Sequence, residues 1–305
     1  MKRGSFIVIL LLFTLSSFAQ INMADSTVKV IGYWDKNEKQ SYAVVEDSYK
    51  VKGVDTVLHE KIKYDVDITI VDSTEKSYTI EWYYRNFSMD TKNEFVKKVM
   101  SIAQDMKVII KTDELGTFEE VVNWVEVQNY IKSAMEKLGK EFPQLPGFGE
   151  LIAQMGLAYS SKEAIETTSI NDIQQFYNFH GAQYKLGEEL TAQTKAPNIL
   201  GGEPFDCSIT AYLDEVNEAD NNYILRSSHE VNKEQLTEAT YKFVVETSQK
   251  MGIKPPARDE LKDLKNDVQT ASRIHGSGWP IYSVQTKTVT DGTNISIKER
   301  VIEIK

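Results

Sequence analysis

The chain has 305 residues, of which 41% are hydrophobic and 26% are charged, and its net charge is −10 at pH 7. This length is enough for one large domain or two modest ones. The acidic balance would repel phosphate backbones and anionic lipid surfaces, which argues against a nucleic-acid partner. Because Cys207 is the only cysteine, no intramolecular disulfide can form and stability must come from core burial.

The N-terminus has the features of a cleavable secretory signal peptide, residues 1–19. Lys2 and Arg3 supply a positive start, and Phe6 to Leu15 form an apolar core of about ten residues, shorter than the roughly twenty that span a bilayer. Small residues then favour cleavage after Ala19; an uncleaved anchor is the alternative. No cysteine near residue 20 could carry a lipid, and no later apolar run reaches spanning length. We therefore expect a soluble periplasmic or secreted bacterial protein that is not a lipoprotein.

Residues 20–140 are predicted to form an N-terminal α+β half. Three segments rich in β-branched and aromatic residues predict strands, and a polar turn separates the last two. A Thr91-x-x-Glu94 capping box predicts a helix that runs to Met106, with an apolar stripe toward the sheet. A hairpin and a second amphipathic helix, which starts at Asn123, follow. The predicted strands are Val51–Leu58, Tyr64–Val71, Tyr78–Tyr84, Lys107–Lys111 and Phe118–Val122.

Residues 141–182 are predicted to be a helical connector, because Pro143, Pro146 and Gly147 open it and helical pieces follow. Residues 183–305 form a C-terminal α+β half. It contains strands, a helix capped by Asn232, a further helix over Arg258–Asp267, and a closing hairpin that turns at Asp291-Gly292. The core face of the helix after Asn232 is expected to hold Leu236, Phe243, Val244, Thr247 and Met251. Its predicted strands are Gln183–Gln193, Phe205–Leu213, Tyr223–Ser227, Ile281–Val289 and Ile295–Ile304.

The two halves repeat one order of elements. Tyr64–Thr69 aligns with Phe205–Thr210, and Tyr78–Met106 aligns without gaps with Tyr223–Met251. An internal duplication would imply a pseudo-twofold arrangement with a binding place at its concave centre. Chance similarity of two ordinary sheet-and-helix segments is the alternative. The predicted fold class is therefore α+β, with antiparallel sheet covered by helices on one face and two related halves.

No constellation of residues predicts a catalytic, metal or cofactor site. A Gly-x-Ser-x-Gly elbow is absent, and His59-Glu60 and His229-Glu230 lack the second histidine of a zinc helix. His180 and His275 are equally isolated, and the glycine pairs lack the rest of a phosphate loop. Catalytic residues, metal ligands and cofactors are accordingly predicted to be none.

Two further candidates have simple structural explanations. Asp65 and Asp67 share one strand face, as paired catalytic carboxylates or calcium ligands would. Because Val66 and Ile68 occupy the opposite face, the aspartates fit the solvent side of an amphipathic strand better. Cys207 alternates with apolar neighbours and is interpreted as a small buried hydrophobe instead of a reactive thiol.

Aromatic residues supply the candidates for ligand binding: Trp82, Tyr84 and Trp279. Trp82 and Tyr84 belong to an aromatic cluster around Arg85, where core packing is the competing interpretation. Trp279 stands between Gly278 and Pro280, which favours a loop where an exposed aromatic side chain is often functional.

The sequence thus favours an exported, non-catalytic protein that binds a partner or an apolar ligand in a recess between sheet and helices. In architecture alone, such a fold resembles periplasmic lipoprotein carriers with half-barrel folds. The first alternative is an envelope hydrolase that uses two carboxylates, which would face one cleft and have perturbed pKa values. The second is a structural or assembly component of the bacterial envelope, marked by an apolar patch or an open sheet edge.

Overall fold

The computed structural model describes residues 20–92, 94–142, 148–198, 200–255, 257–261, 264–290 and 294–305. The predicted signal peptide therefore lies outside the described residues. The same is true of Pro143, Pro146 and Gly147 in the predicted connector, and of the Asp291-Gly292 turn.

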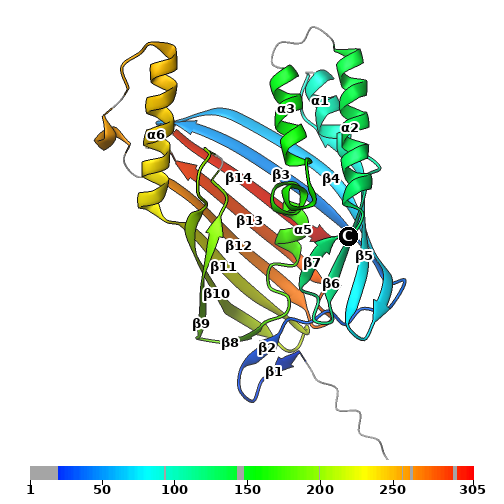
Figure 1. Cartoon of the computed structure of the whole chain (residues 1–305). Coiled ribbons are helices and arrows are strands. Elements are labelled where there is room, and N and C mark those ends of the chain that lie inside the picture. The colour runs from blue at the N-terminus through cyan, green and yellow to red at the C-terminus, as the bar shows by residue number, and fades with distance from the viewer. Residues whose placement is uncertain are drawn as a thin grey trace, which may run out of the picture.

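One antiparallel sheet dominates the fold (Figure 1). Its eleven strands follow the order β7-β6-β5-β4-β3-β14-β13-β12-β11-β10-β9. A three-stranded sheet, β1-β2-β8, lies at one end. In chain order the strands are β1 (Ile21–Asn22), β2 (Thr27–Lys29), β3 (Lys39–Lys52), β4 (Asp55–Thr74), β5 (Ser77–Met89), β6 (Lys107–Asp113), β7 (Phe118–Val121), β8 (Gln183–Lys185), β9 (Glu189–Ala196), β10 (Phe205–Asn217), β11 (Asn222–Val231), β12 (Lys265–His275), β13 (Pro280–Thr290) and β14 (Asn294–Ile304).

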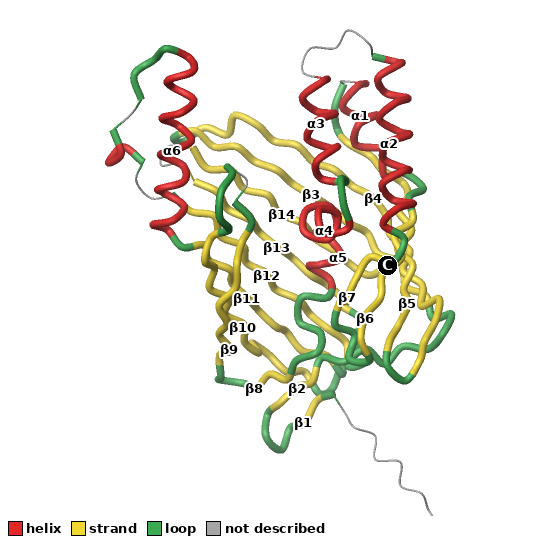
Figure 2. Tube along the Cα trace, in the orientation of Figure 1, coloured by secondary structure: helices red, strands yellow, loops and turns green. Residues whose placement is uncertain are grey.

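The helices are distributed unevenly over the sheet (Figures 1 and 2). Helices α1, α2 and α3 stand together over the end formed by the N-terminal strands, and Phe95 of α1 makes ring contacts with Phe142 and Phe148. α5 lies against β13 and β14. The helical elements are α1 (Glu94–Met100), α2 (Trp124–Glu141), α3 (Phe148–Ala158), α4 (Lys162–Ala164), α5 (Asn171–Phe176) and α6 (Lys233–Met251), with 3₁₀ turns at Ser101–Ala103 and Arg258–Glu260 and a π turn at Ile165–Ser169.

The predicted connector is part of the main core. Ile165, Ile173 and Phe176 are buried against the sheet, and Trp82 and Tyr42 pack edge-on to the ring of Phe176. A second core joins the small sheet to the C-terminal strands; it contains Val28, Val30, Phe179, Tyr184, Leu213, Tyr223, Leu225 and Ile274. The segment between the predicted halves is therefore part of the packed core.

The α+β prediction agrees with a mostly antiparallel sheet and separate helices, but the expected helical cover is incomplete. Asn232 caps α6 as predicted, since its Oδ1 accepts hydrogen bonds from the backbone of Glu234 and Gln235. The predicted apolar face of α6 is not core, however. Phe243 is 47% exposed and Met251 is 67% exposed. The structure therefore confirms Asn232 as the N-cap of α6, and it shows that the predicted core face of this helix is partly exposed.

Several boundaries also differ from the sequence prediction. The predicted strand Val51–Leu58 spans the turn between β3 and β4, and the predicted strand Gln183–Gln193 divides into β8 and β9. α1 ends at Met100 and not at Met106, and a 3₁₀ turn leads on toward β6. The helix expected over Arg258–Asp267 is only a 3₁₀ turn at Arg258–Glu260, and β12 begins at Lys265. Alternating polar residues concealed this strand, because its inward positions include Thr270 and Ser272.

The strand order constrains any relation between the two halves. From β9 the sheet runs to β14 in chain order and then from β3 to β7, so the aligned segments follow each other in the same sense. A two-fold axis would reverse this sense. A related pair of halves would therefore be displaced along one sheet, in place of the expected pseudo-twofold arrangement. The duplication itself stays a prediction.

Candidate functional site

A cavity lies between the N-terminal part of the sheet and the helices. Its volume is about 230 Å³, and most of its wall is apolar. Strands β3 to β6 and β14 supply the floor, and α1, α2 and the segment before α5 supply the roof. The apolar lining residues are Ile62, Tyr64, Tyr84, Phe87, Met100, Ala103, Met106, Val108, Val127, Tyr159, Ile165 and Ile170.

A second cavity of about 320 Å³ adjoins the first toward α1. Ile62, Phe87 and Met100 line both of them. The second cavity adds Met89 of β5 and Lys97 of α1 to the wall. Together they form a recess whose size lies in the range of small-molecule sites.

One end of the recess carries a buried ion pair. Glu46 of β3 is the direct strand partner of Arg300 of β14, and Arg300 Nε donates to Glu46 Oε1 at 2.7 Å. Lys298 Nζ lies 2.6 Å from Glu46 Oε2. Burial acts to raise the pKa of Glu46, but the charges of Arg300 and Lys298 outweigh it and lower that pKa. Glu46 is therefore an ionised bridge between two cations.

A second carboxyl group, Asp172, is buried beside this pair. Tyr64 Oη donates to its Oδ2 at 3.1 Å, while Tyr84 Oη and the Ile173 backbone N–H donate to its Oδ1 at 3.2 and 2.9 Å. Burial nevertheless raises the pKa of Asp172, because Arg300 and the hydrogen bonds only partly offset the lost hydration. Asp172 thus favours its protonated form more than an exposed aspartate does.

Asp172→Asn is expected to raise the free energy of unfolding, and more at pH 7.5 than at pH 4. A raised carboxyl pKa contributes stability below the unfolded value of 3.8, which is lost as pH rises through the folded pKa. Asparagine removes that loss because it never ionises. Urea titrations of both proteins at the two pH values provide the measurement; an equal change at both would contradict the assignment.

The three predicted aromatic residues have different environments. Tyr84 lines the cavity and bonds to Asp172. Trp82 is 0% exposed, lies in the core beside Tyr177 and Phe176, and is not part of the cavity wall. Trp279 is only 3% exposed, and its Nε1 donates to Glu38 at 2.6 Å, so the expected exposed loop position is not observed.

The polar residues of the site were missed from the sequence. Glu46 and Arg300 occupy inward positions of alternating strands, next to Val44 and Ile302. A charge at such a position is the signal that could have identified them, because unpaired charges are not buried. Asp172 gave no such signal, since it lies in the first turn of a short helix.

A buried histidine lies in an aromatic cluster outside the cavity. The ring of His180 packs at a tilt against those of Trp34 and Tyr177, and its Nε2 donates to the Gly278 carbonyl at 2.8 Å. Its Nδ1 has no hydrogen-bond partner among the described residues. Burial lowers the pKa of His180 to about 4. The imidazole is therefore neutral at physiological pH.

His180→Gln is expected to reduce the acid sensitivity of the fold. A depressed histidine pKa gives stability that is complete above the unfolded value of 6.5 and is lost as pH falls toward the folded value of about 4. The wild-type protein should lose about 2 kcal/mol more than the variant between pH 7.5 and pH 5. Denaturant titrations of both proteins at the two pH values test this. The same change in the free energy of unfolding between pH 7.5 and pH 5 for the wild type and the variant would refute it.

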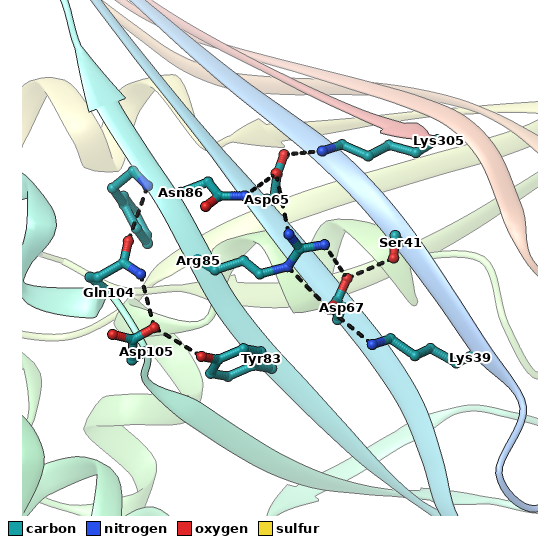
Figure 3. A network of polar contacts seen from close by, with 11 residues as sticks. Lys39, Ser41, Asp65, Asp67, Tyr83, Arg85, Asn86, Gln104, Asp105 and Lys305 are labelled. Atoms are coloured by element: carbon teal, nitrogen blue, oxygen red, sulfur yellow. Dashed lines mark hydrogen bonds and ion pairs between the residues drawn. The ribbon is translucent and has the colours of Figure 1, made fainter.

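The opposite face of the same strands carries a polar network (Figure 3). Asp67 accepts hydrogen bonds from Arg85, Ser41 and Lys39, and Asp65 accepts one from Asn86. Burial would raise the pKa of Asp67, but these donors hold it well below its usual value. The two aspartates form ion pairs on the face opposite Val66 and Ile68, as predicted, but Asp67 is buried among its partners and is not exposed to solvent.

The described residues also bear on metal clusters, on Cys207 and on apolar helices. Within the described ranges, no group of three or more His, Cys, Asp or Glu side chains could hold a metal ion. Cys207 is buried, and burial raises its pKa, as expected for an inert thiol. In the same part of the chain, no helix has both the length and the apolar character needed to cross a bilayer.

Comparison with known proteins gives only distant similarities. No protein-family model and no curated protein matches the chain. Lipovitellin, from a structure concerned with lipid–protein interactions, aligns with 89% of this chain at 12% identity and a TM-score of 0.38; this chain spans 25% of its length. A porin-like protein from Bacteroides uniformis aligns over 90% of this chain and 99% of its own at 6% identity and a TM-score of 0.19. Neither similarity is close enough to assign a fold or a function.

Proposed function

We propose that this is an exported, non-catalytic protein that holds an apolar ligand in the recess between its sheet and the α1–α3 helices. The observation that supports this most directly is the pair of adjoining cavities with largely apolar walls. Both cavities are open to solvent, so a ligand could enter them from outside. A recess of this size inside a packed α+β fold is typical of a binding site.

Binding of the neutral apolar fluorophore N-phenyl-1-naphthylamine tests the proposal. The purified protein is expected to enhance its fluorescence saturably. Ala103→Phe should weaken this binding at least tenfold, because the new ring would occupy the cavity wall. Ala192→Phe, the same change at an exposed position of β9, should leave it unchanged. Absence of saturable binding, or equal effects of both variants, would remove the proposal.

The carboxylate hydrolase is the second candidate, because one observation favours it. Glu46 and Asp172 line the same cavity, and their pKa values are displaced in opposite directions. That pattern occurs in acid and base pairs. Against it, the oxygens of both carboxyl groups already have partners: Arg300 and Lys298 for Glu46, and the two tyrosines with a backbone N–H for Asp172.

A dye-release assay on labelled peptidoglycan separates the two candidates. The binding function predicts no release above the buffer background by the wild-type protein. Release that is abolished by Asp172→Asn, in a variant that still folds, would establish the hydrolase instead.

A further inference from the structure

The concave side of β13 and β14 has an arrangement of cations that the fold itself does not require. Lys287 of β13 is the direct cross-strand partner of Lys298 of β14, so both side chains leave the same face. Lys298 and Arg300 alternate along β14 and both line the first cavity. Two basic side chains therefore line the charged end of the recess, and Lys287 lies beside Lys298 on the same face of the sheet.

Opposed like charges on neighbouring strands destabilise a sheet. The side chain of Lys287 forms no hydrogen bond or ion pair with any part of the chain that the structure describes. Lys287 is exposed to solvent, but partial desolvation by the surrounding strands, followed by the charge of Lys298, lowers the pKa of its ammonium group. The direct opposition of the two ammonium groups therefore costs the sheet some stability.

The nearby acids do not balance these cations. Glu46 is shared by Lys298 and Arg300, and the oxygens of Asp172 already accept hydrogen bonds from Tyr64, Tyr84 and the Ile173 backbone. Arg300 uses Nε for Glu46, while its two terminal nitrogens make no hydrogen bond to a described residue. Donors therefore remain available for an anion, in a chain whose net charge is −10.

We propose that the recess binds an anionic lipid with a long acyl chain, whose headgroup lies between Lys287, Lys298 and Arg300. The acyl chain extends past Phe87 and Met100 into the second cavity. This inference rests on the proposed function, since it specifies the ligand of the same recess. The basic side chains favour an anionic headgroup, and the apolar wall of the recess favours an acyl chain.

The test is displacement of N-phenyl-1-naphthylamine at pH 7.5 by laurate and by 1-dodecanol, which share a chain and differ in charge. Laurate is expected to displace the fluorophore at concentrations at least tenfold lower than dodecanol. The double variant Lys287→Gln/Lys298→Gln should abolish this advantage and leave dodecanol unaffected. Lys63→Gln/Lys76→Gln removes the same charge from lysines outside the concave face and should behave as the wild type.

The outcomes separate the two proposals. If the fluorophore does not bind, the apolar recess itself is wrong. If it binds but laurate and dodecanol compete equally, the recess stands and the headgroup site is overturned. Lys97 and Lys98 also line the second cavity. If the laurate advantage is lost in Lys97→Gln/Lys98→Gln but kept in Lys287→Gln/Lys298→Gln, the proposed orientation of the lipid is overturned.

Discussion

Arg300→Met is expected to lower the free energy of unfolding by about 3–5 kcal/mol, the range for removal of one partner from a buried ion pair. Arg300 is the closest cation to Glu46 Oε1, and its side chain is 8% exposed. Without it, Glu46 keeps only Lys298, whose side chain is 48% exposed and hydrated. The buried carboxylate of Glu46 then has one of the two cations that offset its lost hydration. Urea unfolding followed by tryptophan fluorescence gives the value.

The double variant Glu46→Met/Arg300→Met is the matched control. It removes both charges from the same cross-strand position, and a pair of apolar side chains there is expected to recover most of the lost stability. If the double variant is as unstable as Arg300→Met alone, the loss comes from arginine packing and not from an unpaired carboxylate.

Trp82→Ala is expected to cost about 3–5 kcal/mol, as for other fully buried large side chains. Trp82 is 0% exposed and packs against Phe176 and Tyr177 from the segment between the halves. The change leaves a void at the contact between sheet and α5. The measurement is again equilibrium unfolding in urea. The two free energies of unfolding can be compared if the dependence of the free energy on urea concentration is unchanged by the substitution.

Phe243→Ala on α6 supplies the comparison for Trp82→Ala. Phe243 is 47% exposed, so its removal should cost less than about 1 kcal/mol. A loss as large as that of Trp82→Ala would show that α6 packs against a surface in solution, as its apolar pattern first indicated.

The sequence predicted the elements whose patterns arise from local physics. Hairpins such as β6–β7 and β13–β14 alternate clearly, and the cap at Asn232 depends only on its own turn. β12 was missed because small polar residues occupy its buried positions. α6 was assigned a core face because its periodic residues carry no information on what lies opposite them. Burial of an amphipathic face depends on neighbours that only the tertiary structure supplies.

The site was less accessible to prediction for the same reason. Tyr84 was a candidate, and it does line the cavity. Trp279 was chosen for its glycine and proline neighbours, but a turn between strands can point an indole inward, where Glu38 accepts its N–H. The charged end requires strand registers that join distant parts of the chain, and no local pattern specifies a register across β3 and β14.

The pairing of β3 with β14 also sets the order in which the molecule can be assembled. Arg300 and Glu46 are 254 residues apart in the chain, yet they meet near the middle of the sheet. Until the later strand arrives, β3 presents an open hydrogen-bonding edge that can recruit other chains. Such distant pairing slows folding. We expect the sheet to finish folding only after β14 has been synthesised. A nascent chain interrupted before Asn294 would therefore leave the edge of β3 without its strand partner.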